Sequence, residues 1–310
     1  MATAQVGFIG LGNMGGRMTR CLVRGGAAVI GYDLVETAAA AAGAVPASSP
    51  GDVVEASDVV LLSLPDSRAV EQVVLGDGGV LARSRPGQVV VDLSTAAPSS
   101  TRRLSTTLAE QGVDYLDAGI SGGAAAADRG ALTLMVGGSA ETLAQVRPVL
   151  DHFSEKVFHV GDSGAGHATK LLNNFLNAVS LAATAEVMVA ARKAGLDLAT
   201  VLEVLNASSG VNFATTNRFP HIIQGDYLEG GLTNTLMLKD VTLYCEYVSS
   251  LGVTSLNSAG PVASFGLARA LGYADQISNR VVDAIGDVSG GVRVTPPIDP
   301  EQPQQPGGPT

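Results

Sequence analysis

One short stretch of the sequence places a lysine and three asparagines on one side of a helix. Lys170, Asn173, Asn174 and Asn177 fall within an arc of about 100° at helical spacing. The residues between them are mostly apolar, so we expect a buried helix whose polar stripe needs partners. Burial disfavours an ammonium ion, which makes Lys170 a candidate general acid/base with the asparagines as hydrogen-bonding neighbours. A surface lysine among solvated asparagines is the alternative.

A glycine-rich motif at the N-terminus has the spacing that binds the phosphates of a dinucleotide. Gly10, Gly12 and Gly15 form a G-x-G-x-x-G after an apolar run and before a helical stretch, as that motif requires. The first glycine permits a tight turn, the second lets the backbone approach a pyrophosphate, and the third lets helix and strand pack closely. A chance glycine-rich turn is the alternative in a chain with 38 glycines. The expected cofactor loop comprises Gly10, Leu11, Gly12, Asn13, Met14 and Gly15.

A carboxylate downstream of this motif indicates which dinucleotide binds. Asp33 ends the second apolar run, where a carboxylate accepts hydrogen bonds from the ribose 2′-hydroxyl of NAD. A 2′-phosphate would meet a like charge there, and Leu34, Val35 and Glu36 supply no cation to offset it. We therefore expect NAD, with NADP less favoured. Asp33 can also serve as a helix N-cap, with or without the ribose contact.

These residues need a parallel sheet followed by helices to position them. From residue 4 to about 160, short β-branched runs that are apolar throughout alternate with helical stretches, as in a parallel sheet covered on both faces. The fold class is therefore α/β: an N-terminal Rossmann, doubly wound sheet, followed by an all-α C-terminal domain joined by a long helix. The expected strands are Gln5–Ile9, Ala27–Tyr32, Val59–Ser63, Gln88–Asp92, Asp114–Asp117, Leu132–Val136 and Val157–Val160. The expected helices include Met14–Arg24, Ser99–Gln111, Ala140–Leu150, Leu198–Ala207, Thr235–Leu251 and Gly260–Leu271.

The domain boundary is expected at a glycine-rich joint near residue 164. After this joint, residues 167–194 contain no glycine or proline, which predicts one helix of about 40 Å at 1.5 Å per residue. The predicted domains are an NAD-binding domain at 1–163 and a helical substrate and oligomerisation domain at 164–294. Residues 295–310 form a proline-rich tail that we expect to be disordered.

The composition limits the classes of protein that this chain can represent. With 310 residues, 46% of them hydrophobic and 15% charged, it is neither a disordered chain nor a coiled coil. A net charge of −10 argues against binding to nucleic acid or anionic lipid, and no membrane span is predicted. Two cysteines and the absence of a signal-peptide pattern predict a reduced, cytoplasmic protein. Lysine is scarce, with four in all: Lys156, Lys170, Lys193 and Lys239.

Six segments, in the same order as in the family, make the chain resemble the β-hydroxyacid dehydrogenases. This family includes 3-hydroxyisobutyrate dehydrogenase and tartronate semialdehyde reductase and is related to 6-phosphogluconate dehydrogenase. The resemblance extends from about Val6 to Gly272. The segments are GFIGLGNMG at 7–15, LP at 64–65, DLST with Pro98 at 92–98, DAGISGG with GALT at 117–133, GAGHATKLLNN at 164–174, and LMLKD at 236–240.

The resemblance implies an NAD-dependent oxidoreductase that interconverts a β-hydroxyacid and its semialdehyde or keto acid. Lys170 matches the catalytic lysine that exchanges the hydroxyl proton, and Asn174 matches a substrate-binding asparagine. Ser121, Gly122 and Gly123 match the loop that holds the substrate carboxylate. Leu64, Pro65 and Thr95 match cofactor contacts, and Lys239, followed by Asp240, matches a lysine at the nicotinamide end. No metal site is expected.

Departures from the family pattern bear on the substrate. Gly119 and Ile120 replace a Pro-Val pair, which we interpret as freeing the backbone before the carboxylate loop. Arg218 can pair with a second acidic group or lie on the surface as an ordinary arginine. The candidate specificity residues of the helical domain are Ser208, Ser209, Asn212, Phe213, Asn217 and Arg218.

Two other functions remain as alternatives, and a quaternary structure is expected. Imine reductases share this architecture but usually carry Asp or Tyr where Lys170 stands. Non-catalytic cofactor-binding interaction proteins typically lose this lysine, which the present chain keeps. A long apolar helix in a small helical domain predicts a homodimer or homotetramer that forms through that domain.

Overall fold

The computed structural model describes residues 5–296, which form two compact units. Unit 1 contains residues 5–175 and 242–255, and unit 2 contains residues 176–241 and 256–296. The division falls inside two helices, α9 (Ala165–Lys193) and α13 (Asn234–Ser250). The boundary expected near residue 164 coincides with the change from strands to helices. That the chain divides into domains at this residue stays a prediction. Apart from Thr295 and Pro296, the tail lies outside the described residues.

In the described part of the chain, unit 1 is built on one sheet of eight strands. The strand order is β3-β2-β1-β4-β5-β6-β7-β8, and β1 to β6 are parallel. The order reverses between β1 and β4, as expected of a doubly wound sheet. The strands are β1 (Val6–Ile9), β2 (Val29–Tyr32), β3 (Val45–Pro46), β4 (Val59–Leu62), β5 (Val89–Asp92), β6 (Asp114–Ser121), β7 (Leu132–Gly137) and β8 (Ser154–Gly161).

The sheet departs from the expected all-parallel arrangement at β7, which pairs with β6 in the antiparallel direction. Residues 122–131 alone connect these two strands, fewer than the dozen or more that a parallel crossover needs. β6 also runs four residues beyond the expected end at Asp117, to Ser121. The chain reversal therefore places Gly122 and Gly123 directly after a strand end.

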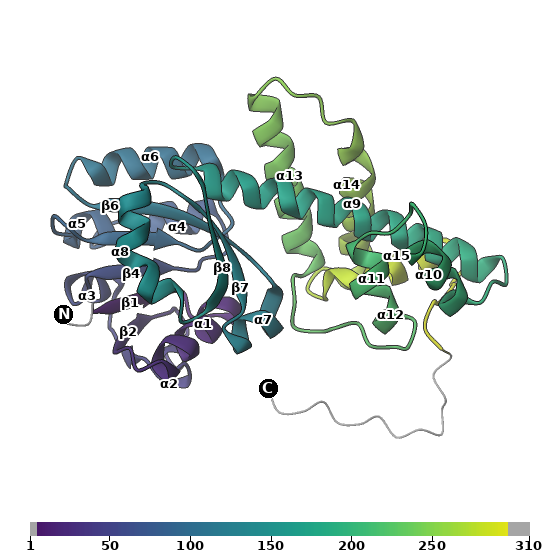
Figure 1. Ribbon diagram of the computed structural model, residues 1–310, viewed down its shortest axis with the longest axis horizontal. Helices are drawn as coiled ribbons and strands as arrows, with labels where there is room; N and C mark the ends of the chain where they lie inside the picture. The colour runs from purple at the N-terminus through teal and green to yellow at the C-terminus, as the bar shows by residue number, and fades with distance from the viewer. Residues whose placement is uncertain (1–4, 297–310) are drawn as a thin grey trace. The chain divides into compact units, whose positions relative to one another are not determined.

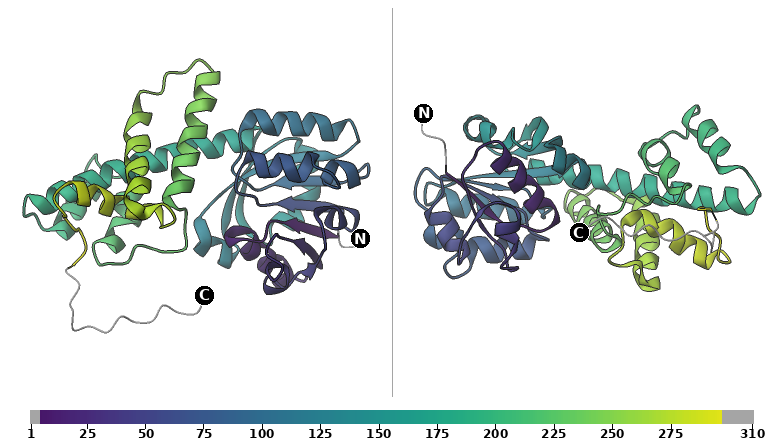
Figure 2. Two further views of the ribbon diagram at one scale, coloured as in Figure 1. Left: turned by 180° about the vertical axis from the view of Figure 1, so that it is seen from behind. Right: turned by 90° about the horizontal axis from the view of Figure 1, so that it is seen from below.

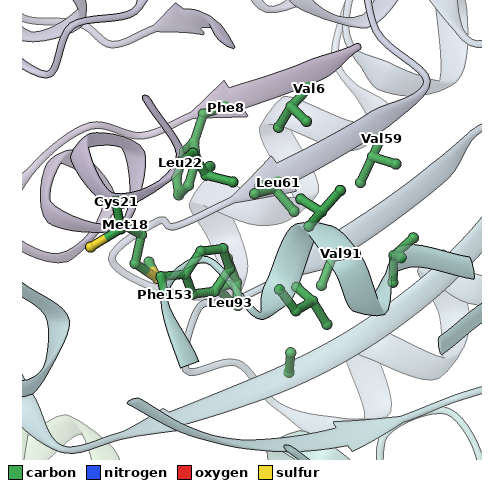
Figure 3. Packing of buried hydrophobic residues seen from close by; sticks show 14 of the residues in the cluster. Val6, Phe8, Met18, Cys21, Leu22, Val59, Leu61, Val91, Leu93 and Phe153 are labelled. Atoms are coloured by element: carbon green, nitrogen blue, oxygen red, sulfur yellow. The ribbon is translucent and has the colours of Figure 1, made fainter. Parts of the chain in front are cut away.

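Alternating residues of the central strands enter two separate cores, one on each face of the sheet. Phe8 and Leu61 pack with helix α1 on one face, whereas Ile9 and Leu62 pack with α3 and α6 on the other. Figure 3 shows the first core, in which Phe8, Leu22 and Phe153 lie together. Both faces of the sheet are covered by helices (Figure 1), which explains why the strand sequences are apolar without alternation.

The helices of unit 1 follow the strands in a β-α order. α9 begins in this unit and continues unbroken into unit 2 (Figure 2), close to the expected range of residues 167–194. The second half of α13 also belongs to this unit. The helices that lie wholly within it are α1 (Asn13–Arg24), α2 (Ala38–Ala41), α3 (Pro50–Glu55), α4 (Ser67–Leu75), α5 (Val80–Arg83), α6 (Pro98–Ala109), α7 (Gly123–Arg129) and α8 (Ala140–Leu150).

Unit 2 is helical in the residues that the structure describes. Its core contains Phe219 and Phe265, both fully buried, together with Met188 of α9 and Met237 of α13. Its remaining elements are α10 (Leu198–Asn206), α11 (Phe213–Asn217), α12 (Phe219–Ile222), α14 (Ala259–Ala268), α15 (Val281–Val288) and the short turns η1 (Leu256–Ser258), η2 (Arg269–Tyr273) and η3 (Ser278–Arg280).

Among the helices between residues 5 and 296, only α9 is long and apolar enough to cross a membrane. Buried core helices meet the same two criteria, and 56% of its most apolar stretch is buried within the protein. The helix therefore supports no membrane assignment.

Candidate functional site

The expected cofactor residues of unit 1 follow the carboxyl ends of adjacent parallel strands. Gly10 follows β1, Asp33 follows β2, Leu64 follows β4 and Thr95 follows β5, while Ser121 ends β6. Because parallel strands end at the same edge of a sheet, these residues gather around the point where the strand order reverses. This edge is where dinucleotides bind in open α/β sheets.

The glycine loop has a geometry that larger residues would disrupt. Gly10 has a φ of +89°, and a Cβ there would collide with the carbonyl oxygen of Ser63. A Cβ on Gly15 would collide with the carbonyl oxygen of Gly10, so this glycine lets α1 pack against β1. A Cβ on Gly12 would meet no described atom within 4 Å. The exposed turn before α1 thus leaves room for a phosphate group at Gly12, and the residues fit a dinucleotide.

The carboxylate of Asp33 binds two backbone amides. Its Oδ2 accepts a hydrogen bond from the N–H of Leu11 at 2.6 Å, and its Oδ1 accepts one from the N–H of Val35 at 2.9 Å. Asp33 is not the N-cap of α2, because Thr37 occupies that position. The side chain thereby links the glycine loop to the end of β2, and Leu34 beside it is 88% exposed.

Two further loops at this edge are tied together through a serine. The N–H of Leu64 donates to Oγ of Ser94 at 2.9 Å, and the N–H of Ser94 donates to Oδ1 of Asp92 at 3.0 Å. Thr95 is half-buried beside them, whereas Pro65 is exposed. The loops after β4 and β5 are therefore held in one arrangement.

The first turns of α9 rest tightly on β6. The buried carboxylate of Asp117 accepts hydrogen bonds from the N–H groups of Gly164 at 2.7 Å and His167 at 2.8 Å. A negative charge at a helix N-terminus satisfies free N–H groups and complements the helix dipole. A Cβ on Gly166 would collide with the carbonyl oxygens of Asp117 and Met135. The position of this helix end is therefore set by the strand beneath it.

Lys170 lies one turn further along α9, beside β6. A Cβ added to Gly119 would lie 2.5 Å from Cβ of Lys170, so the missing side chain makes room for the lysine stem. Lys170 is half-buried, Asn174 is 3% exposed and Asn177 is half-buried, while Asn173 is exposed. Of the four residues in the expected polar stripe, three are therefore at least partly buried, and only Asn173 is exposed.

The Ser-Gly-Gly loop follows directly on β6. Ser121 is half-buried, and Gly122 and Gly123 are exposed with φ values of +125° and +68°. Such angles favour glycine, and the exposed backbone of these two residues is accessible to a ligand.

Sequence reasoning did not assign roles to a buried polar network beneath α9. His167 contacts Thr101 Oγ1 through Nδ1 at 2.7 Å and the carbonyl oxygen of Asp92 through Nε2 at 3.2 Å. The hydroxyl of Tyr115 donates to Oδ2 of Asp92 at 2.8 Å. Burial, and then the charge of Asp92, raises the pKa of Tyr115, so this hydroxyl keeps its proton. The sequence contained one indication of this network: Asp92 and Asp117 each stand at the end of an apolar run, where a carboxylate needs buried partners.

Lys239 lies on α13 in unit 2. Its Nζ is 3.2 Å from Oδ1 of Asp240, whose side chain is 2% exposed. The pair is therefore more buried than the solvated charge pair that the two residues alone would indicate. Among residues 5–296, no cluster of three or more His, Cys, Asp or Glu side chains is placed to hold a metal ion.

Two family models together match most of the chain. The NAD-binding domain of 6-phosphogluconate dehydrogenase matches residues 5–161. The NAD-binding domain of NADP-dependent 3-hydroxyisobutyrate dehydrogenase matches residues 164–284.

Similar proteins are dehydrogenases of small hydroxyacids. The chain is 36% identical to 2-(hydroxymethyl)glutarate dehydrogenase of Eubacterium barkeri, over 92% of this chain and 96% of that protein. It is 38% identical to the NAD-dependent L-serine dehydrogenase of Pseudomonas aeruginosa, over 88% and 94%. The structure of Mycobacterium tuberculosis 3-hydroxyisobutyrate dehydrogenase with L-serine superposes with a TM-score of 0.82 at 31% identity, over 91% and 99%. An imine reductase from Pseudomonas sp., at 17% identity and a TM-score of 0.60, shares the fold alone.

Proposed function

This chain belongs to the β-hydroxyacid dehydrogenase family, and we propose that it is an NAD-dependent oxidoreductase with Lys170 as its general acid/base. It interconverts a β-hydroxyacid and the corresponding semialdehyde or keto acid. The observation that carries the assignment of Lys170 is its position on α9, whose first turns rest on β6 through Asp117 and Gly119. The Ser-Gly-Gly loop ends the same strand.

In the proposed mechanism, each residue acts on one part of the substrate. The N–H groups around Ser121, Gly122 and Gly123 bind the carboxylate, which a chain of net charge −10 must hold through local donors. The amide of Asn174 orients the hydroxyl-bearing carbon. Nζ of Lys170 takes the hydroxyl proton during oxidation and returns it during reduction. The dinucleotide, when bound, accepts or supplies the hydride.

We assign NAD as the cofactor, with NADP less favoured, because of the groups after β2. The glycine loop from Gly10 to Gly15 would hold the pyrophosphate, and Asp33 the ribose hydroxyls, with Leu64, Pro65, Thr95 and Lys239 as further contacts. A 2′-phosphate beside Asp33 would meet a like charge and no nearby cation in residues 34–36. The relative named as an NAD-dependent L-serine dehydrogenase supports this choice.

The substrate is a small molecule that carries a carboxylate, as the names of the relatives indicate. The relatives act on hydroxyisobutyrate, L-serine and 2-(hydroxymethyl)glutarate, which share a β-hydroxyacid group. A panel of β-hydroxyacids and semialdehydes, followed by NADH absorbance, identifies the preferred compound. We further propose a cytoplasmic protein that contacts neither nucleic acid nor membrane.

The decisive experiment replaces the proposed acid/base. Lys170→Ala should lower turnover by about 10²- to 10⁴-fold, the usual contribution of general acid/base catalysis, and leave NADH affinity nearly unchanged. The matched control is Lys193→Ala, which removes another lysine of α9 whose Nζ binds the carbonyl oxygen of Ser289. Wild-type turnover in Lys170→Ala would disprove the assignment.

A further inference from the structure

Arg218 in unit 2 is a partly buried cation whose hydrogen-bond partners are neutral. It occupies the junction between α11 and α12. Its Nη1 donates to Oδ1 of Asn279 at 2.6 Å, and its Nη2 donates to Oδ1 of Asn177 at 3.0 Å. In the part of the chain from 5 to 296, no carboxylate forms an ion pair with this guanidinium.

Two other arginines of the same unit are paired with acids. Arg280 forms ion pairs with Asp283 and Glu229, and Arg293 forms one with Asp287. Burial lowers the pKa of Arg218 to about 10, which still leaves it charged at neutral pH. A charge that has lost water without gaining a counterion is unfavourable, and an arriving anion relieves that cost.

The residues around Arg218 hold its side chain in place. Asn279 is 2% exposed, and its Nδ2 donates to the carbonyl oxygen of Tyr227 at 2.8 Å, which directs its Oδ1 toward the arginine. Asn212 caps α11, the helix that ends at Arg218. The Phe213 ring, 58% exposed, lies 5.8 Å from the guanidinium carbon. A guanidinium has five N–H donors, and the two asparagines engage its two Nη atoms through one bond each.

We propose that Arg218 is an anion-binding residue of unit 2 and that its ligand is a carboxylate. A carboxylate matches the planar fork of a guanidinium and supplies the negative charge that its protein neighbours lack. Two sources can provide this group: a second carboxylate on the substrate, or a separate dicarboxylate ligand. Only the first source rests on the proposed dehydrogenase function.

Binding of glutarate to the full chain tests the proposal without turnover. Isothermal titration should show affinity for glutarate and none for uncharged glutaramide. Arg218→Gln should weaken glutarate binding by about 10- to 100-fold, since hydrogen bonds to charged groups contribute that much. Arg192→Gln is the matched control, because Arg192 binds the neutral carbonyl oxygen of Val294 in the same unit. Equal affinity in Arg218→Gln and wild type would overturn the proposal.

A second variant protects the test against misfolding. Arg218→Lys keeps the charge but cannot form the fork, so it should bind glutarate several-fold more weakly than wild type. If Arg218→Gln does not fold, Arg218→Lys decides the test: a folded lysine variant that binds glutarate as tightly as wild type contradicts the proposal. Thermal unfolding of each variant establishes that it is folded.

Kinetics then distinguish the two sources of the carboxylate. The assay compares a β-hydroxyacid that carries a second carboxylate with an analogue whose second carboxylate is an amide. A fall in kcat/KM of about 10- to 100-fold in Arg218→Gln, confined to the dicarboxylic acid, identifies the substrate as the source. If Arg218→Gln and wild type have equal kcat/KM for both substrates but the variant no longer binds glutarate, the carboxylate comes from a separate ligand. The glutarate measurement does not depend on catalysis by Lys170. The proposals for Lys170 and for Arg218 can therefore be disproved independently.

Discussion

Asp33 holds two backbone segments together, and we propose that the same side chain also determines the choice of cofactor. Its two carboxylate oxygens accept hydrogen bonds from Leu11 in the glycine loop and from Val35 after β2. In the proposed role, the same charge accepts hydrogen bonds from the ribose of NAD and repels the 2′-phosphate of NADP. Removing the carboxylate should therefore weaken NAD binding and remove the repulsion against NADP.

We expect Asp33→Ala to lower kcat/KM for NAD⁺ by about 10- to 100-fold, the range for a hydrogen bond to a charged group. The value for NADP⁺ should fall less, so the preference between the two cofactors narrows or reverses. Steady-state kinetics with both cofactors measures this ratio, and circular dichroism shows whether the loop-to-strand link is needed for folding. Preference of the wild-type protein for NADP⁺ would contradict our interpretation of Asp33.

The sequence alone was enough to name Lys170 as a candidate, but it could not predict which residues hold the lysine side chain in place. Lys170 and Asn174 were singled out by helical spacing, and the structure places them on α9 as half-buried and buried residues. The environment of Lys170 could not be predicted, because it depends on Gly119 and Asp117, which are about 50 residues away in the sequence. Gly119 was expected to free the backbone, whereas it pairs with Met135 inside β6 and makes room for the lysine stem.

At the scale of elements, the contact between α9 and β6 depends on the absence of one Cβ. An alanine at 119 would place its Cβ 2.5 Å from Cβ of Lys170 and 3.1 Å from the carbonyl oxygen of Gly166. The first of these atoms is fixed to the helix backbone, so the helix end itself must move. Misplacing a catalytic group by about 1 Å can lower the rate by about 10²-fold.

Gly119→Ala should therefore lower kcat by at least about 10-fold and destabilise the fold by about 1–3 kcal/mol, the usual cost of overpacking. The KM for NAD⁺ should change little, because the glycine loop follows β1 and not β6. The control is Gly266→Ala in α14, where an added Cβ meets no described atom within 4 Å. Kinetics and thermal unfolding of both variants test the idea, which fails when Gly119→Ala keeps wild-type kcat.

Elements with a strong hydrophobic pattern were predictable, and those defined by backbone pairing were not. α9 was expected at residues 167–194 and is found at Ala165–Lys193. β3 has two residues, Val45 and Pro46, both exposed, so its side chains carry no strand pattern. The antiparallel direction of β7 follows from the short connection after Ser121, which has too few residues for a parallel crossover. The number of residues in this connection, and not their types, carried the information.

At the scale of the whole molecule, exposed apolar side chains are the basis for our prediction that copies of the chain associate. Unit 2 presents Leu256 at 82% exposure, Leu176 at 66% and Val204 at 59%. Isolated exposed apolar residues are common in monomers, so the expectation rests on their number within a small helical unit. Closed symmetric oligomers are the usual way of covering such side chains.

We predict a homodimer or homotetramer that forms through unit 2. Light scattering should give two or four times the chain mass of 31.3 kDa. Leu256→Glu places a charge where apolar contact is expected, so it should shift the mass toward the monomer at low micromolar concentration. Leu75→Glu, at a 48% exposed leucine of unit 1, is the matched control and should leave the mass unchanged. A wild-type mass of 31.3 kDa would contradict the prediction. An assembly disrupted by Leu75→Glu and not by Leu256→Glu would place the interface outside unit 2.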